Sequence, residues 1–142
     1  MQKDTAEIAN QIKNAKSPEE LLPDVDNSLP PLTLAQYLNS LLTERKLKKS
    51  QLALAAGIDA SYCCHLLDGT KKTTARPRLL AIACALSLSE KETRRLPYYA
   101  GQPQLYPRVP WDAAVIYALQ NKLTVIETNL MLEQLHLQPL LN

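Results

Sequence analysis

The sequence predicts an all-α protein. Leucine and alanine dominate its 142 residues, phenylalanine is absent, and only three glycines occur. Because β-sheets favour branched and aromatic side chains, this composition favours helices. Apolar residues also recur at helical spacing in several segments, each preceded by a residue that commonly starts a helix.

Residues 1–32 differ in composition from the rest of the chain. They hold three lysines against six acidic side chains, and Pro23, Pro30 and Pro31 interrupt residues 21–32. An amphipathic helix can form over 4–16, and residues 17–20 have the serine, proline and glutamate of a helix start. We expect an acidic, flexible N-terminal arm without the apolar stretch of a secretory signal.

Thr33 opens the compact part of the chain. It can cap a helix over 34–46, and Gln36 lies at the position that completes a capping box. Leucines at helical spacing give this helix one apolar face: Leu34, Leu38, Leu41 and Leu42.

Two short helices joined by a tight turn are expected next, at about 49–56 and 60–68. Asp59 can cap the second helix, and Gly69 ends it. A small residue between the helices, followed four positions later by Gly57, lets them cross at close range. The inward positions are Leu52, Ala53, Cys63 and Leu66.

Four further helical segments complete the chain. A basic loop over 70–74 leads to Pro77, which suits the start of a helix ending at Leu86. Residues 89–142 are expected to form a helical extension that serves dimerisation or regulation. Pro97 lies inside the first helix of this extension and should kink it or end it early. The starts of the extension's helices are marked by Ser89 with Glu92, by Pro110, and by Thr124 with Glu127.

A faint internal repeat lies in this extension. Residues 88–105 match 123–141 in the order Leu, Ser or Thr, Glu-Thr, Leu, Gln-Pro, Leu, with about 35 residues between copies. The match predicts two similar helix-then-proline units packed beside each other. Two copies are too few for a solenoid.

Positive charge is concentrated in the part of the chain that contains the two short helices. Residues 33–78 hold eight basic against three acidic side chains, whereas 79–142 hold five of each, and the whole chain has a net charge of +2. Such a concentration of cations suits a polyanionic partner. The alternative is an ordinary solvated lysine face.

Residues 33–88 resemble the lambda-repressor-like, Xre-type helix-turn-helix family. The resemblance rests on Leu47, Leu52-Ala53, Gly57-Ile58, Asp59, Gly69, Pro77 and the ending Ala85-Leu86-Ser87-Leu88-Ser89. It implies a five-helix domain whose second and third helices bind double-stranded DNA. It also implies a transcriptional regulator that places the helix at 60–68 in the major groove, as a homodimer.

The outward face of the helix at 60–68 determines what it can read. Ala60 can contact a thymine methyl group, and Ser61 or His65 can hydrogen-bond to base edges. Because the face has no Arg, Gln or Asn, base recognition is expected to be modest, with DNA shape or a dimer supplying part of the specificity. Asp68 is unfavourable there unless it caps a backbone group or binds a lysine. Four residues share this face: Ser61, Cys64, His65 and Asp68.

Phosphate contacts are expected beside this face. Backbone N–H groups at the start of both short helices can add to the side-chain contacts. Tyr62 has an alternative interpretation as a half-buried packing residue. The expected phosphate ligands are Lys48, Lys49, Ser50, Tyr62, Lys71 and Lys72.

Several features that suggest other chemistry have simpler explanations. Cys63, Cys64 and His65 are consecutive on a helix and diverge by about 100° each, so they cannot all bind one metal ion. Cys63 and Cys84 are expected in the core, whereas an exposed Cys64 could be a redox-sensing thiol. The three cysteines do not suggest a disulfide framework. No catalytic motif occurs, so neither an enzyme nor a cofactor is expected.

Two further interpretations concern the extension and the location of the chain. Trp111 can join Tyr98, Tyr99 and Tyr106 in an aromatic cluster, or line a small pocket with them. No apolar run approaches the roughly 20 residues that span a bilayer, so a cytoplasmic protein is expected.

The competing function is a protein-interaction adaptor, or an antitoxin-like module, that docks a partner through the C-terminal helices. Either a homodimer or such a partner would use their apolar residues: Ile116, Leu119, Leu123, Ile126, Leu130 and Leu135.

Overall fold

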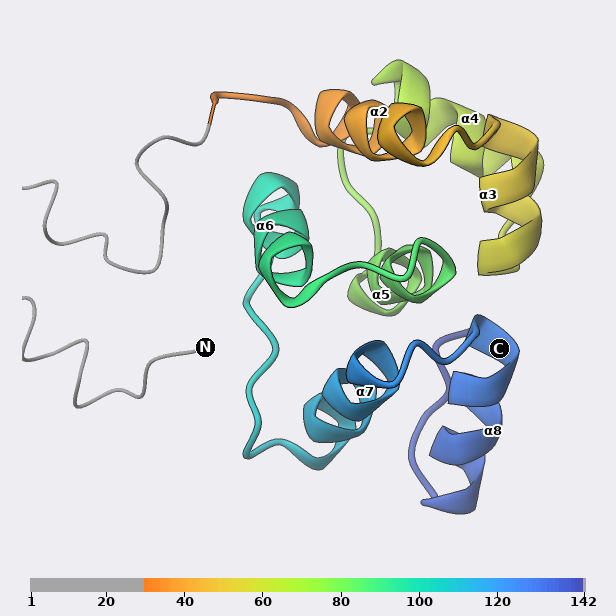
Figure 1. Cartoon of the computed structure of the whole chain (residues 1–142), viewed down its shortest axis with the longest axis vertical. Helices are drawn as coiled ribbons and strands as arrows, with labels where there is room; N and C mark the ends of the chain where they lie inside the picture. Colours follow the sequence, from red (N-terminus) through yellow and green to blue (C-terminus); the bar gives the residue numbers. More distant parts are fainter. Residues whose placement is uncertain (1–29, 142) are drawn as a thin grey trace, which may run out of the picture. The chain divides into compact units, whose positions relative to one another are not determined.

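The computed structural model describes residues 30–141, and this range holds seven α-helices and no β-strand (Figure 1). The all-α prediction is thus confirmed for these residues. No helix among them is long and apolar enough to cross a membrane. The expectations for residues 1–29 lie outside the described part. All the helices belong to the unit Leu32–Asn142: α2 (Leu34–Arg45), α3 (Lys49–Ala56), α4 (Ala60–Asp68), α5 (Arg76–Ala85), α6 (Glu90–Ala100), α7 (Pro110–Gln120) and α8 (Val125–Gln134).

The expected capping boxes form at three helix starts. At α2, the Thr33 hydroxyl accepts a hydrogen bond from the Gln36 N–H at 3.2 Å, and the Gln36 side chain accepts one from the Thr33 N–H at 2.9 Å. These reciprocal bonds satisfy backbone donors that a helix start leaves without partners. The same pairs form at α6 and α8: Ser89 with Glu92, and Thr124 with Glu127.

Residues 33–88 contain four helices, not the five expected there. The next helix, α6, begins at Glu90 and packs against α2 and α5. It also continues through Pro97, so the expectation of an early end is wrong. A proline removes one backbone hydrogen-bond donor from a helix. Burial of Leu96 and Pro97 in the core stabilises the helix here, and it ends only at Gly101, which caps it in a left-handed conformation with φ 67°.

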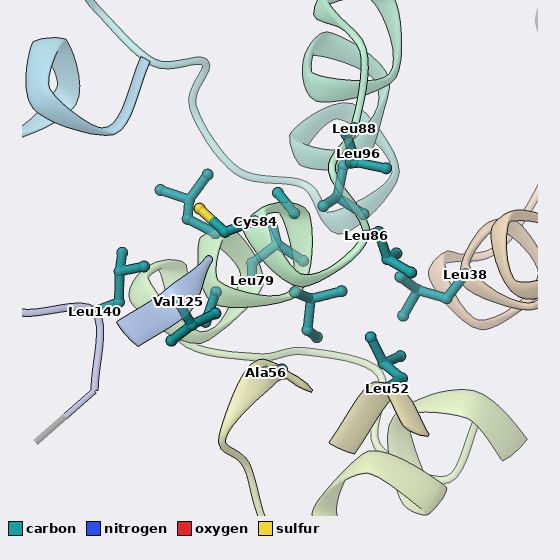
Figure 2. Close-up of a cluster of buried hydrophobic side chains, with 14 of the residues drawn as sticks. Leu38, Leu52, Ala56, Leu79, Cys84, Leu86, Leu88, Leu96, Val125 and Leu140 are labelled. Atoms are coloured by element: carbon teal, nitrogen blue, oxygen red, sulfur yellow. The ribbon is translucent and has the colours of Figure 1, made fainter. Parts of the chain in front are cut away.

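The central helix of the unit is α5, which contacts α3, α6, α7 and α8. All its residues from Leu79 to Cys84 are buried, as befits a helix covered on every side. Figure 2 shows Leu52 of α3, Leu96 of α6 and Val125 of α8 in the cluster that surrounds it. The first half of the described chain (33–88) and the second half (89–141) therefore share one hydrophobic core.

The internal repeat is visible in the structure and is larger than expected. The hairpin α5–α6 and the hairpin α7–α8 have the same turn, in which Leu88 N–H bonds to the Ala83 carbonyl at 3.2 Å and Leu123 N–H to the Ala118 carbonyl at 3.0 Å. The two hairpins contact each other through α5, which packs against both α7 and α8. Two pairs of equivalent residues share a left-handed backbone, Ser87 with Lys122 and Gly101 with His136. A third pair, Leu105 with Leu140, is buried.

A buried tyrosine between α2 and α6 leads to a stability prediction. The Tyr37 ring lies 4.6 Å from the Tyr99 ring, centroid to centroid, and its buried hydroxyl has no hydrogen-bond partner among residues 30–141. Burial, assisted by the charge of Glu92, raises the pKa of Tyr37 to about 12. Tyr37→Phe removes this unpartnered polar atom, so we expect the free energy of unfolding to stay constant or rise by about 1 kcal/mol in urea denaturation. A clear loss of stability would contradict this.

Candidate nucleic-acid interface

Helices α3 and α4 occupy the ranges that the sequence predicts, and three residues connect them. Gly57 adopts a left-handed conformation with φ 71°, and a Cβ atom there would lie 3.0 Å from the Leu141 side chain. The Asp59 carboxylate accepts a hydrogen bond from the Tyr62 N–H at 3.3 Å and so caps α4. The four expected inward residues are all buried: Leu52, Ala53, Cys63 and Leu66.

The opposite side of α4 faces solvent, as expected for Ala60, Ser61, Cys64, His65 and Asp68. Asp68 is unfavourable on this face unless it caps a backbone group. It does so, because its carboxylate accepts a hydrogen bond from the Thr70 N–H at 2.7 Å. The Thr70 hydroxyl and N–H lower the pKa of Asp68 and keep it ionised. The His65 ring nitrogen lies 3.8 Å from the same carboxylate.

The cations of residues 33–78 divide into two groups. Arg45 and Arg76 form ion pairs with acidic residues of the second half, Glu92 at 2.7 Å and Asp112 at 2.8 Å. The other basic side chains are exposed, so they create the positive surface: Lys46, Lys48, Lys49, Lys71, Lys72 and Arg78.

Tyr62 is half-buried, and its ring gathers two of these cations. The Lys71 ammonium lies 5.1 Å and the Arg78 guanidinium 4.6 Å from the ring centroid. The Tyr62 hydroxyl is hydrogen-bonded to that of Thr74. Burial favours the neutral phenol, but the hydrogen bonds to Thr74 and Arg78 outweigh it and lower the pKa of Tyr62. The structure thus agrees with the packing interpretation of Tyr62, and phosphate contact by this residue stays a prediction.

Exposed cations lie at the border of the exposed face of α4. At 100° per residue, Tyr62 borders this face on one side and Cys64 on the other. The cations Lys71 and Arg78 lie against Tyr62. The start of α3 also lies near α4, because the Cys63 thiol is 3.9 Å from the Lys49 carbonyl, and the charge of Lys49 contributes to the lowered pKa of Asp68.

The start of α3 presents the remaining expected phosphate ligands. Lys48 and Ser50 are exposed, and the Lys48 N–H donates to the Gln51 side chain at 2.8 Å. The backbone donors are fewer than expected, because Gln51 occupies this N–H and Asp59 occupies that of Tyr62. An anion at these helix starts would therefore meet mainly side chains.

Residues of the second half form hydrogen bonds with the end of the basic loop (70–74) and with the start of α5. The Thr74 carbonyl accepts a hydrogen bond from the Gln102 side chain at 2.6 Å. Arg76 donates to both carboxylate oxygens of Asp112, at 3.0 and 2.8 Å, and Asp112 also accepts from the Tyr106 N–H at 2.8 Å. Sequence reasoning missed the contacts of Thr74 and Arg76, because they join residues 28 and 36 positions apart.

The expected aromatic cluster does not form around Trp111. Its ring lies 5.6 Å from the Arg76 guanidinium, and its indole N–H donates to the Gln138 carbonyl at 2.7 Å. Tyr98 and Tyr99 contact each other edge to face at 5.3 Å. Trp111 thus contacts the first half through the Arg76 cation, because it precedes Asp112, the partner of Arg76, and it holds the C-terminal segment through the Gln138 carbonyl.

The three cysteines divide as expected. Cys63 and Cys84 are buried and Cys64 is exposed. Burial raises the pKa of the Cys63 and Cys84 thiols, so both stay protonated in the core. Redox sensing by Cys64 stays a hypothesis.

The apolar residues proposed for partner binding are exposed only in part. Leu119 is buried, and Ile116 and Leu123 are partly covered. Three residues at and after α8 face solvent: Ile126 at 73%, Leu130 at 54% and Leu135 at 53% exposure. On the first half, Leu54 of α3 is 85% exposed.

Comparisons with protein-family models, curated proteins and solved structures find no match for this chain. Its function therefore has to be inferred from its own residues. The described geometry places a polar helix face beside exposed cations, and such a surface suits a polyanion.

Proposed function

We propose that the chain is a DNA-binding transcriptional regulator that inserts α4 into the major groove of double-stranded DNA. The observation that carries this proposal is the exposed polar face of α4 beside exposed cations, with Lys71 and Arg78 held at the bordering Tyr62 ring. A major groove is about 12 Å wide, admits one helix and is bordered by phosphates on both sides. Exposed cations beside the polar face of α4 suit that arrangement.

In this proposal, α3 and α4 form the helix-turn-helix unit of a lambda-repressor-like domain. The domain extends from α2 to α6, since α6 packs against α2 and supplies the fifth helix. Ser61 and His65 contact base edges and Ala60 a thymine methyl group, while exposed lysines bind phosphates. Affinity therefore comes mainly from the backbone, and sequence preference partly from DNA shape.

Selection of bound duplexes from a random pool tests this proposal. We expect the purified full chain to enrich a palindromic site with half-sites about one helical turn, roughly 34 Å, apart, because a two-fold dimer repeats its reading helix at that spacing. A pool with scrambled half-site spacing is the control. Failure to retain any duplex at low salt would overturn the proposal.

The exposed aliphatic residues favour the second function, an adaptor or antitoxin-like module. Ile126 and Leu130 lie one turn apart on α8 and face solvent. At the equivalent positions of the first hairpin, 35 residues earlier, α6 has Lys91 and Arg95. Such residues suit contact with a protein partner or with a second copy of the chain. A wild-type chain that binds no DNA would favour the adaptor.

A further inference from the structure

Two exposed cations lie at the Tyr62 ring. Lys71 and Arg78 are held 5.1 and 4.6 Å from one ring centroid although their like charges repel. Neither forms an ion pair with a carboxylate anywhere in residues 30–141. An anion that contacts both cations would relieve this repulsion.

The ring that gathers the two cations is itself fixed. Its hydroxyl bonds to Thr74, whose side chain is buried and whose carbonyl accepts the hydrogen bond from Gln102. Arg78 lies on the first turn of α5, two residues after the Arg76 that is anchored to Asp112. Because the three groups come from α4, the loop and α5, their approach is a product of the fold rather than of local spacing.

We propose that Tyr62, Lys71 and Arg78 form a phosphate clamp that binds a backbone phosphodiester of the duplex beside α4. This inference rests on the proposed function and deepens it by adding Arg78, which the sequence analysis did not select. The planar guanidinium offers paired donors to phosphate oxygens, and the lysine supplies a mobile point charge. The aromatic face stabilises both cations in the absence of the anion.

The salt dependence of DNA binding tests the clamp. We expect Arg78→Gln and Lys71→Gln each to reduce the slope of log K against log salt by about 0.9, and the double variant by about 1.8. Arg108→Gln is the matched control, because this exposed arginine lies outside the basic segment and should leave the slope unchanged. Fluorescence anisotropy of one labelled duplex between about 50 and 200 mM salt measures the slopes.

Two outcomes separate the clamp from the DNA-binding function. A wild type that binds DNA with the same slope as the double variant would overturn the clamp alone. If the wild type binds no DNA at low salt, the DNA function fails, and a titration with inorganic phosphate examines the clamp by itself. Tyr62 ring signals in NMR that shift in the wild type but not in Arg78→Gln would then support a phosphate site, and signals that do not shift would overturn it.

Discussion

Replacing Asp112 by alanine is expected to lower the free energy of unfolding by about 3 kcal/mol. The Asp112 side chain is only 6% exposed and accepts two hydrogen bonds from Arg76 and one from the Tyr106 N–H. Its removal leaves the partly buried Arg76 guanidinium without its counter-charge. Desolvation of an unpaired charge is the main cost of such a truncation.

The same pair predicts how stability changes with pH. Burial opposes ionisation of Asp112, but the hydrogen bonds and charge of Arg76 outweigh it and lower the pKa below its usual 3.8. A carboxyl whose pKa is lower in the folded state stabilises the protein above the unfolded pKa and loses that effect as the pH falls through the folded value. The difference between wild type and Asp112→Ala should therefore be largest at neutral pH and shrink below about pH 4.

Urea denaturation at several pH values measures both effects. Arg76→Met combined with Asp112→Leu is the matched control, since it removes both charges and should recover much of the lost stability. A single variant within about 0.5 kcal/mol of wild type at pH 7 would show that the ion pair contributes little.

The sequence predicts the local structure of this protein well because local signals are strong in it. Capping boxes, prolines at helix starts and glycines at helix ends act within one or two turns, and Thr33, Ser89 and Thr124 all cap helices as expected. The outward and inward faces of α4 also follow from its helical period alone. Even the repeat is detectable, because it depends on the same local signals.

The residues that organise the basic loop could not be identified in this way. Contacts between segments distant in the chain involve Thr74, Gln102 and Asp112. The spacing of apolar residues in the sequence does not indicate which polar residue will be buried. Arg78 belongs to the segment whose excess charge is visible in the sequence, but its position on the Tyr62 ring depends on how α5 meets α4. The charge count itself overestimated the free cations, since Arg45 and Arg76 are neutralised by the second half.

Changing Lys48, Lys49, Lys71 and Lys72 together to glutamine is expected to have the largest effect on binding. Each phosphate contact releases close to one counterion, so the loss of all four should weaken DNA binding by about three orders of magnitude near 0.1 M salt. The salt slope should fall by about 3.6. Because all four side chains are exposed, the free energy of unfolding should change by no more than about 0.5 kcal/mol.

The fourfold Lys→Arg variant is the matched control for this change. It keeps every charge and should retain the salt slope, so a loss of binding in the glutamine variant alone identifies charge as the cause. Equal affinity of the glutamine variant and the wild type would contradict the interface described above. If the wild type does not bind duplex at low salt while both variants fold normally, the lysines form a solvated surface. The exposed residues of α8, Ile126 and Leu130, then become the surface through which the chain acts on a protein partner.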